Sequence, residues 1–247
     1  MEYIAGRQPL LEALKAGLPL KKIYLAESLQ GKAAEQVCLL ARQQGIPVEN
    51  IPRRQLDRMV STDLNHQGML AQAEPLPNYT PSDLLARARK LQETPFILLL
   101  DHLQGPFNLG NLIRTAAGLG VHGVVIPKRR SADLTPAAAK GAAGALSWVP
   151  VARVGSLAQA LNYFQQEGLW AVGAEAGAGK PFYELDYKMP LVLLLGGEDK
   201  GLSRLLKERC DFLTHLPMEG KINSFNVSVA GALIMYEVYR QRKGWVK

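Results

Sequence analysis

The sequence is poor in the residues that build disulfide frameworks and metal sites. Of its 247 residues, 2 are cysteine and 4 are histidine. Cys38 and Cys210 lie far apart and outside any CxxC pair, so we expect two buried free thiols. The histidines show no ligand spacing with the cysteines, and the sequence therefore predicts no metal site.

Long apolar stretches are also missing. No window approaches the roughly eighteen uninterrupted apolar residues of a membrane span, and the Met-Glu-Tyr start lacks the basic, then apolar, pattern of a signal peptide. Hydrophobic residues nevertheless make up 47% of the chain, which is enough to build real cores. We therefore expect a soluble cytoplasmic protein, and its length favours two unequal domains.

Glycine-rich nucleotide-binding motifs do not occur in their proper context. Residues 118–123 match GxGxxG, but they end a predicted helix and precede a strand, the reverse of the dinucleotide arrangement. Neither 177–180 nor 196–200 has the spacing and the following Ser or Thr of a P-loop. The sequence therefore offers no support for nucleotide hydrolysis.

Acidic residues are outnumbered by basic ones. The chain has 29 Lys and Arg against 22 Asp and Glu, which gives a formal net charge of +7. Such an excess favours a polyanionic partner, because the phosphates of a nucleic acid attract cationic side chains. Each local cluster can equally be a solvated face; the clusters are Lys21-Lys22, Arg53-Arg54, Lys128-Arg129-Arg130 and Arg240-Gln241-Arg242-Lys243.

Residues 1–75 are predicted to form a small α/β domain. Helical and extended patterns alternate along it, at 9–16, 22–26, 32–44, 46–50 and 68–72. The stretch 76–94 contains Pro77 and Pro81 and is typical of a connector, so we expect a linker there.

Residues 95–247 are predicted to form a second, larger α/β domain. Its apolar runs, which we predict to be strands, lie at 96–100, 123–126, 149–152, 169–172, 191–195 and 212–216. Helices are expected between and after them, at 109–119, 136–146, 156–167, 203–209 and 227–242. This alternation predicts a mostly parallel sheet covered on both faces, with the ligand beyond the carboxyl ends of the strands.

Three segments that follow predicted strands are richer in Gly, Asn and charge than packing requires. In the first, Asn108, Asn111 and Arg114 recur at threes, so a helix would place two amides and a guanidinium on one face. Such a face can bind one ligand. The alternative is that Asn108 caps the helix and Arg114 is a surface charge.

In the second segment an apolar strand runs into Gly196, Gly197 and Glu198. Glycines let a backbone approach a ligand closely, and the carboxylate can fix an Arg or a hydroxyl. A plain strand-to-helix turn is the alternative interpretation.

The third segment, 216–230, leads into the last predicted helix. Gly220, Ser224 and Asn226 offer hydrogen bonds to a polar heterocycle, and Met218 and Ile222 can pack against its faces. The alternative is that Ser224 or Asn226 only caps the helix.

Taken together, the three segments resemble the three motifs of the SpoU/TrmH RNA 2'-O-methyltransferases. The matching patterns are Asn108-x-x-Asn111-x-x-Arg114, Gly196-Gly-Glu198-x-x-Gly201-Leu202 and Pro217-Met-x-Gly220-x-x-x-Ser224-x-Asn226-Val-Ser-x-Ala230. Their order and spacing match over the region from Pro95 to the end. Phe225 stands where leucine is more usual and Asp199 where a small residue is common, and neither departure removes a polar group of the motifs.

The resemblance implies an α/β fold with a trefoil-knotted SPOUT methyltransferase domain and a small N-terminal α/β (L30e-like) substrate-binding domain. Family members thread the third segment through a loop and form homodimers through the knot. Pattern reasoning by itself favours an unknotted doubly wound sheet, because knots are very rare.

The resemblance also implies S-adenosyl-L-methionine as the cofactor, with no metal. It assigns cofactor binding to Gly196, Gly197, Glu198, Gly201, Met218, Ile222, Ser224, Phe225 and Asn226. Arg114 is implied to act on the ribose 2'-hydroxyl, and the residues implied to surround it are Asn108, Glu198, Ser224 and Asn226. Whether Arg114 takes the proton or stabilises the developing alkoxide stays open, because the pKa of an arginine is very high.

Two early segments resemble the substrate-binding domain of family members that methylate guanosine in 23S ribosomal RNA. They are Gly6-Arg7-Gln-Pro9-Leu-Leu-Glu-Ala13-Leu and Asn65-His66-Gln67-Gly68. The implied function is 2'-O-methylation of a guanosine ribose in 23S ribosomal RNA. The alternatives are a transfer RNA 2'-O-methyltransferase and a non-catalytic RNA-binding or ribosome assembly factor, and the intact motif residues argue against the non-catalytic one.

Overall fold

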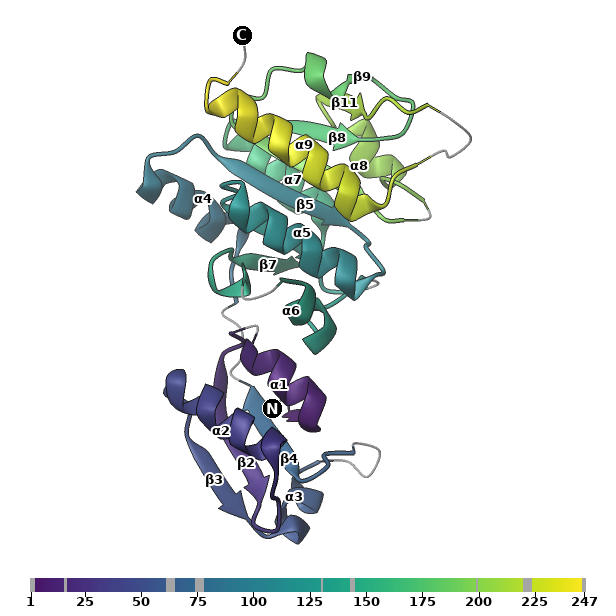
Figure 1. Cartoon of the computed structure of the whole chain (residues 1–247). Helices are drawn as coiled ribbons and strands as arrows, with labels where there is room; N and C mark the ends of the chain where they lie inside the picture. The colour runs from purple at the N-terminus through teal and green to yellow at the C-terminus, as the bar shows by residue number, and fades with distance from the viewer. Residues whose placement is uncertain are drawn as a thin grey trace. The chain divides into compact units, whose positions relative to one another are not determined.

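The computed structural model describes most of the chain, namely residues 3–15, 17–60, 65–73, 78–129, 131–142, 145–198, 200–219 and 224–245. The chain divides into two compact units, Met1–Pro77 and Asn78–Lys247 (Figure 1). Among the described residues, no helix combines the length and the apolar character needed to cross a membrane.

The described residues of the first unit form a four-stranded sheet with helices on both faces. In sheet order the strands are β1 (Tyr3–Ala5), β4 (Met69–Ala73), β2 (Leu20–Ala26) and β3 (Val48–Ile51). The helices are α1 (Arg7–Lys15), α2 (Lys32–Gln43) and α3 (Arg53–Met59). Strand β4 runs antiparallel to β1 and β2, whereas β2 and β3 are parallel. Helices α1 and α2 pack on one face of this sheet, and Leu56 of α3 packs on the other.

Two elements of the first unit were not expected from the sequence, and one prediction about it was wrong. Strand β1 is three residues long, too short to show alternation, and α3 buries only Leu56.

The two cysteines were predicted to be buried, but Cys38 is exposed. The reason is that α2 buries Val37 and Ala41, four residues apart, and Cys38 is turned about 100° away from that face. Cys210 is free and half-buried, and burial raises the pKa of its thiol to about 12.

The described strands of the second unit form a seven-stranded sheet in which every strand pair is parallel. In sheet order they are β7 (Val151–Val154), β6 (Gly123–Pro127), β5 (Phe96–Asp101), β10 (Leu191–Gly196), β8 (Trp170–Ala174), β11 (Phe212–His215) and β9 (Lys180–Pro181). Strands β5 and β10 lie at the centre and are buried almost throughout, as a parallel strand covered on both faces must be. The predicted parallel α/β sheet is therefore confirmed.

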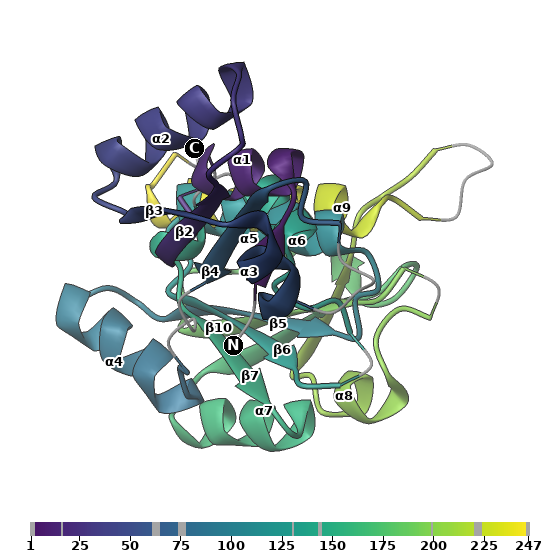
Figure 2. The same cartoon turned by 90° about the horizontal axis from the view of Figure 1, so that it is seen from below.

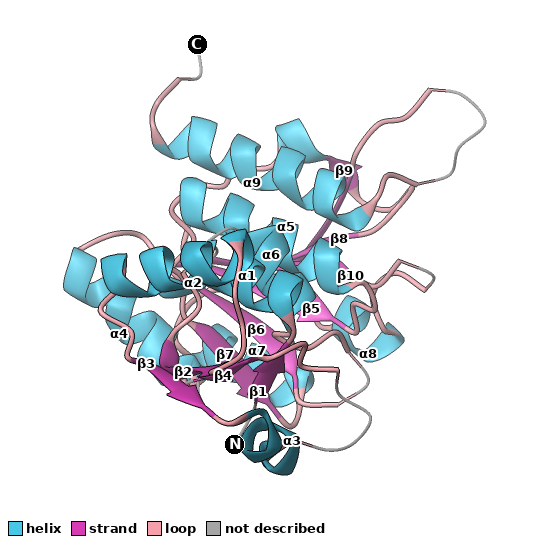
Figure 3. Cartoon of the chain, turned by 60° about the horizontal axis from the view of Figure 1, so that its bottom comes forward, coloured by secondary structure: helices cyan, strands magenta, loops and turns pink. Residues whose placement is uncertain are grey.

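Helices cover both faces of this sheet (Figures 2 and 3). On one face lie α5 (Pro106–Gly118), α6 (Pro136–Ala142) and α9 (Val227–Arg242). On the other lie α4 (Pro81–Leu91), α7 (Leu157–Gln166) and α8 (Arg204–Glu208). The helix predicted at 136–146 corresponds to α6, which ends at Ala142, and to the 3-10 helix η1 (Ala145–Ser147). The 3-10 helix η2 (Phe182–Glu184) and the two-residue β9 were not predicted.

Helix α4 occupies most of the stretch that was predicted to be a linker. A capping box starts it, in which the Asp83 backbone N–H donates to Thr80 Oγ1 and the Thr80 N–H donates to the Asp83 carboxylate. Leu84 and Leu85 pack against the sheet of the second unit. Residues 81–91 therefore belong to the core of that unit.

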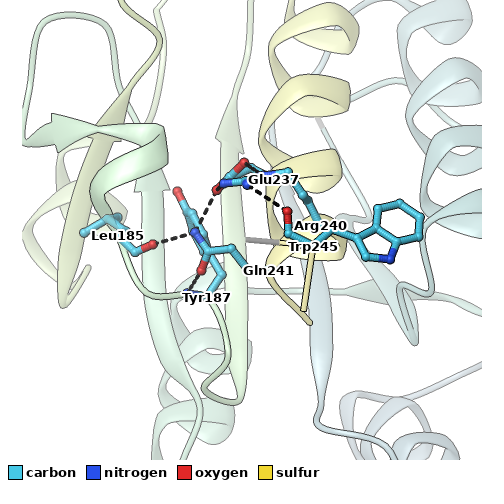
Figure 4. A network of polar contacts seen from close by, with 6 residues as sticks. All are labelled: Leu185, Tyr187, Glu237, Arg240, Gln241 and Trp245. Carbon is cyan, nitrogen blue, oxygen red and sulfur yellow. Dashed lines mark hydrogen bonds and ion pairs between the residues drawn. The ribbon is translucent and has the colours of Figure 1, made fainter. Parts of the chain in front are cut away.

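The carboxyl-terminal half of α9 is anchored by polar contacts to the chain that precedes β10 (Figure 4). The Gln241 amide donates to the carbonyl of Leu185 at 2.9 Å and to the carboxylate of Glu237 at 2.8 Å. Its oxygen accepts from the Tyr187 N–H at 2.9 Å. Because Gln241 is buried, these contacts fix both the position and the rotation of the helix end.

Arg242 holds the same end of α9 to the amino-terminal edge of the sheet. Its guanidinium donates to the carbonyls of Thr94, Pro95, Tyr187 and Met189. Burial lowers the pKa of Arg242 to about 10, so the side chain is still cationic at neutral pH. One arginine therefore joins α9 to the segments before both central strands.

Helix α5 lies so close to α6 that only glycine fits at one position. A Cβ atom at Gly110 would lie 2.2 Å from the carbonyl oxygen of Ala138. We expect Gly110→Ala to force the helices apart and to lower the free energy of unfolding by about 1–3 kcal/mol. Gly118→Ala is the matched control, because nothing lies within 4 Å of its Cβ, and alanine should stabilise that helix by about 0.5–1 kcal/mol. Thermal and urea unfolding of both variants measure the difference, and equal stability of the two would contradict this packing.

Candidate active site

The loops that follow the two central strands start side by side at the carboxyl edge of the sheet. Asp101, the last residue of β5, is paired in register with Gly196, the last residue of β10. A Cβ atom at Gly197 would lie 2.8 Å from the carbonyl oxygen of His102, so the two backbones touch. His102 itself has a positive φ of 56°, an uncommon conformation for a residue with a side chain. The two loops are therefore held in one tight arrangement.

Glu198 is the acceptor that ties these loops together. Its Oε1 accepts from Asn108 Nδ2 at 2.7 Å and from the Gly105 N–H at 3.2 Å, and its Oε2 accepts from the Gln104 N–H at 3.2 Å. Partial burial acts to raise the pKa of Glu198, but these hydrogen bonds outweigh it and lower the pKa below the ordinary value. The carboxylate is therefore ionised at neutral pH, and both of its oxygens accept hydrogen bonds.

Asn226 extends this contact to the third segment. Its Nδ2 donates to Asn108 Oδ1 at 3.2 Å, and its Oδ1 accepts from the N–H and the hydroxyl of Ser228 at 2.9 and 2.6 Å. Asn226 is thus the N-cap of α9 and a member of the site at once. Asn108 is not a cap, because α5 begins at Pro106 after the N-cap Gly105. We call the chain from Glu198 through Asn108 to Asn226 the three-loop network.

A cavity of about 550 Å³ opens beside the three-loop network. Eight of the nine residues to which the resemblance assigned cofactor binding line it, namely Gly196, Gly197, Glu198, Gly201, Met218, Ser224, Phe225 and Asn226. The ninth, Ile222, lies outside the described residues, as do Gly220 and Asp199. The second and third segments therefore line one cavity, and Asn108 of the first segment is hydrogen-bonded to both of them.

The glycines of the second segment form a turn that a larger residue would break. The Gly201 N–H donates to the Gly197 carbonyl at 3.0 Å, and Gly201 has a φ of +62°. A Cβ atom at Gly196 would lie 2.0 Å from the carbonyl carbon of Gly201. The backbone of this turn consequently lies bare along one side of the cavity.

The prediction from sequence missed several residues of the cavity wall. Glu175 accepts from Lys207 Nζ at 2.8 Å and from the Leu202 N–H at 3.4 Å, and so braces the glycine turn from β8. Thr214 of β11 is fully buried and donates to the Lys180 carbonyl. Glu175 lies three residues after the strand predicted at 169–172, a signal that could have placed it at the same edge. Thr214 lies inside an apolar run and gave no such signal.

Arg114 does not line this cavity. Asn111 lies one helical turn after Asn108 on α5, and Arg114 lies two turns after it; both side chains are exposed. In the described part of the chain, neither a hydrogen bond nor an ion pair engages the guanidinium of Arg114. Of the five residues predicted to be catalytic, the structure therefore groups Asn108, Glu198, Ser224 and Asn226 and leaves Arg114 on the open face of the helix.

The three-loop network leads to a prediction about charge at Asn108. Asn108→Asp would remove the donor to Glu198 and place two carboxylates in contact, so the free energy of unfolding should fall by about 1–3 kcal/mol at pH 7. Ionised Glu198 contributes stability above the ordinary glutamate pKa, and this contribution is lost as the pH falls through its lowered pKa. The deficit of the variant should therefore shrink in acid, below about pH 4. Asn111→Asp, on the exposed face of the same helix, is the control. A pH series of unfolding curves measures the effect, and a deficit independent of pH would show that the network is not electrostatic.

Comparisons with known proteins agree with the two-part organisation of the chain. Residues 95–236, more than half of it, match the SpoU rRNA methylase family. Residues 3–79 match the RNA 2'-O ribose methyltransferase substrate-binding domain. The structure is similar to that of the SpoU methyltransferase AviRb from Streptomyces viridochromogenes in complex with its cofactor AdoMet, with a TM-score of 0.72 and 24% identity over 98% of this chain and 90% of that one. It is also similar to a tRNA-modifying TrmH/SpoU enzyme of A. aeolicus, with a TM-score of 0.56 and 28% identity over 66% of this chain and 86% of that one.

Two relatives match along nearly the whole length. The Bacillus subtilis (strain 168) protein YacO, assigned to the TrmH family of tRNA/rRNA methyltransferases, is 46% identical over 241 residues, which cover 98% of this chain and 96% of YacO. A protein of Staphylococcus saprophyticus with the same family assignment is 40% identical over 240 residues, covering 97% of this chain and 95% of that protein. The chain therefore belongs to the SpoU rRNA methylase family of RNA methyltransferases.

Proposed function

We propose that this protein transfers a methyl group from S-adenosyl-L-methionine to the 2'-hydroxyl of a guanosine ribose in 23S ribosomal RNA. The observation that carries the proposal is the cavity lined by the second and third motif segments, which Asn108 of the first segment joins through hydrogen bonds. The RNA substrate-binding family match over residues 3–79 supports a large structured RNA as the partner. Such a substrate would place the reaction in the cytoplasm.

The cavity suits the cofactor in size and in chemistry. Its volume of about 550 Å³ lies within the usual range of roughly 300–1,000 Å³ for small-molecule sites. Leu195, Leu216 and Ile234 provide apolar surface for a flat heterocycle, and the bare glycine turn provides backbone hydrogen-bonding groups. When bound, the cofactor supplies an electrophilic methyl group that needs no metal for activation. Among the described residues, no three His, Cys, Asp or Glu side chains gather into a metal site.

The chain's own residues would position the acceptor and control its proton. In this proposal Asn108 and Glu198 fix the loops at the mouth of the cavity, and Ser224 and Asn226 present polar groups there. Arg114 carries a guanidinium that no described side chain engages, so it is free to bind the ribose 2'-oxygen as negative charge develops on it.

A homodimer completes this proposal. Three large apolar residues recur every three or four positions on the exposed face of α9, at 42–51% exposure: Val229, Leu233 and Tyr236. Phe225, which precedes the helix, is 43% exposed. A stripe of this kind is typical of a protein interface. Because Arg114 does not line the cavity of its own chain, pairing through this side of the molecule offers a way to bring it to a substrate at the neighbouring cavity.

The trefoil knot implied by the resemblance is also part of the proposal. It rests on the family to which the chain belongs. The last helix, α9, starts at the carboxyl edge with Asn226 and ends at the amino edge with Arg242. Gly231 in its middle approaches both α5 and β10, since a Cβ there would lie 2.5 Å from Leu112 and 2.6 Å from Leu195. The last helix is thus laid tightly across the central strands.

A transfer RNA is the second candidate substrate, because the relatives are assigned to a tRNA/rRNA methyltransferase family. The solved tRNA-modifying enzyme matches a smaller part of this chain than AviRb does. The tRNA-modifying enzyme of A. aeolicus aligns with 66% of this chain, whereas AviRb aligns with 98%. The additional N-terminal unit is therefore the feature that favours a larger RNA.

The first functional prediction concerns substrate and metal. The purified protein should methylate a 23S ribosomal RNA transcript with radiolabelled cofactor in the presence of EDTA, because the sulfonium activates the methyl group. Transfer RNA transcripts serve as the comparison, and mapping of 2'-O-methylation identifies the nucleotide. Activity on transfer RNA alone would replace the ribosomal substrate with the second candidate. Activity that requires a divalent ion, with the RNA shown to stay folded, would contradict the metal-free reaction.

The second functional prediction concerns Arg114. Arg114→Ala should lower single-turnover methylation by roughly 100-fold or more while cofactor affinity changes little, because the guanidinium acts mainly as charge develops on the oxygen. Arg114→Lys keeps the charge but loses the planar fork, so it should restore little activity. Lys90→Ala, at an exposed cation of α4 outside the three motifs, is the control. Near-normal turnover in Arg114→Ala would remove Arg114 from the reaction, and equal losses of cofactor affinity and turnover would assign it to the pocket structure.

A further inference from the structure

A second cavity of about 550 Å³ opens at the carboxyl ends of β5, β6 and β7. His102, from the end of β5, and Lys128 and Arg129, from the end of β6, line it together with the first residues of α7 and α8. Its apolar floor includes Leu157 and Leu206, which belong to the core on the α7 and α8 side of the sheet. The active-site cavity instead contacts α9 through Ile234, on the other side. We call this second cavity the basic pocket.

The basic pocket and the active-site cavity share one wall. The segment from Gly196 to Gly201 lines the active-site cavity, and Ser203, two residues later, lines the basic pocket. This segment is fixed to β5 because the Ser203 N–H donates to Asp101 Oδ2 at 2.6 Å. The two cavities therefore lie back to back across the carboxyl edge of the sheet.

The charge of the basic pocket is positive. Lys128 and Arg129 are exposed, and no carboxylate of the described residues lies within 4 Å of either. Asp101 is the carboxylate of the pocket, but it is buried, accepts from Ser203 and pairs with His102. The first turn of α7, which Ser156 caps, adds a favourable field for an anion. Two cations in a concave space are thus not paired with any carboxylate of the described part of the chain.

We infer that the basic pocket binds a backbone phosphate of the RNA substrate, in contact with Lys128 and Arg129. This inference rests on the proposed function and extends it to the path of the RNA. A strand that passes from the basic pocket over the shared wall reaches the active-site cavity. The cations of the pocket are exposed rather than deeply buried, which suits a continuous phosphodiester chain at the surface better than a small enclosed anion.

The backbone of Lys128 is held by the sheet, and Arg129 follows it directly. The Lys128 N–H donates to the Val154 carbonyl at 2.9 Å, which continues the pairing of β6 with β7 beyond the last residue of β6. Flexible side chains therefore project from a rigid strand end. This arrangement can register an RNA strand without reading its sequence, as phosphate contacts do.

The test is a charge-removing double variant with a matched control. Lys128→Gln with Arg129→Gln removes both cations of the pocket. Lys90→Gln with Lys188→Gln removes the same charge from exposed positions shortly before β5 and β10, at the opposite edge of the sheet. Binding of the full chain to a 23S ribosomal RNA fragment is measured across a salt series, beside single-turnover methylation and calorimetric cofactor binding.

For the pocket variant we expect weaker RNA binding and a logarithmic salt slope reduced by roughly 0.7 for each phosphate that the variant no longer neutralises. Methylation at subsaturating RNA should fall in parallel, while cofactor affinity and the control variant stay at the parent level. Equal losses in the two double variants, or no loss in either, would overturn the inference. Thermal unfolding with and without inorganic phosphate is measured for both double variants as well. If the pocket variant loses only the rise in melting temperature that phosphate gives the parent, and binds and methylates RNA normally, the pocket is a free-anion site and the inference is overturned. A parent protein that binds RNA but methylates none of it would instead contradict the proposed function.

Discussion

The site depends on one run of hydrogen bonds, from the Glu198 carboxylate through the Asn108 amide to Asn226. It joins residues that are 90 and 118 positions apart in the chain. Each member also holds its own segment: Glu198 accepts from the loop after β5, and Asn226 caps α9. An amide is required in the middle, because Asn108 must donate to a carboxylate and accept from a second amide at the same time. Three loops are thereby given one arrangement, and the second and third of them line the cavity.

The network holds this arrangement because α9 is fixed at both ends. Asn226 holds its start at the carboxyl edge, and Gln241 and Arg242 hold its end against the segments before β5 and β10. Between these points, Gly231 allows the helix to lie directly on Leu112 and Leu195. The packing of α9 therefore also positions the site, because the residues that bury the inner face of α9 hold its N-cap, Asn226, next to Asn108.

The glycine turn after β10 separates two chemical environments. On the α9 side it offers bare backbone to a cavity with apolar walls, and Glu175 braces it from β8. On the α7 side its continuation closes a pocket lined by Lys128 and Arg129. The Asp101 carboxylate, which is nearly inaccessible to solvent, fixes the wall between them through Ser203. The apolar walls and bare backbone on the α9 side suit the ring of a cofactor, whereas the cations on the α7 side suit the phosphates of an RNA backbone.

The sequence by itself determined most strands and helices of the second unit, though not α4, because its central strands are buried on both faces and read as continuous apolar runs between amphipathic helices. It also determined which three segments are polar beyond the needs of packing. It could not show the short strands β1 and β9, the exposure of Cys38, or the fully buried Thr214, since each depends on what packs against it. Only the tertiary structure decided that Asn226 contacts Asn108, that Arg114 lies away from the cavity, and that Lys128 and Arg129 face a pocket. The physical reason is that periodicity reports a residue's neighbours within a few turns, whereas these contacts are set by strand order and by the helices that cross the sheet.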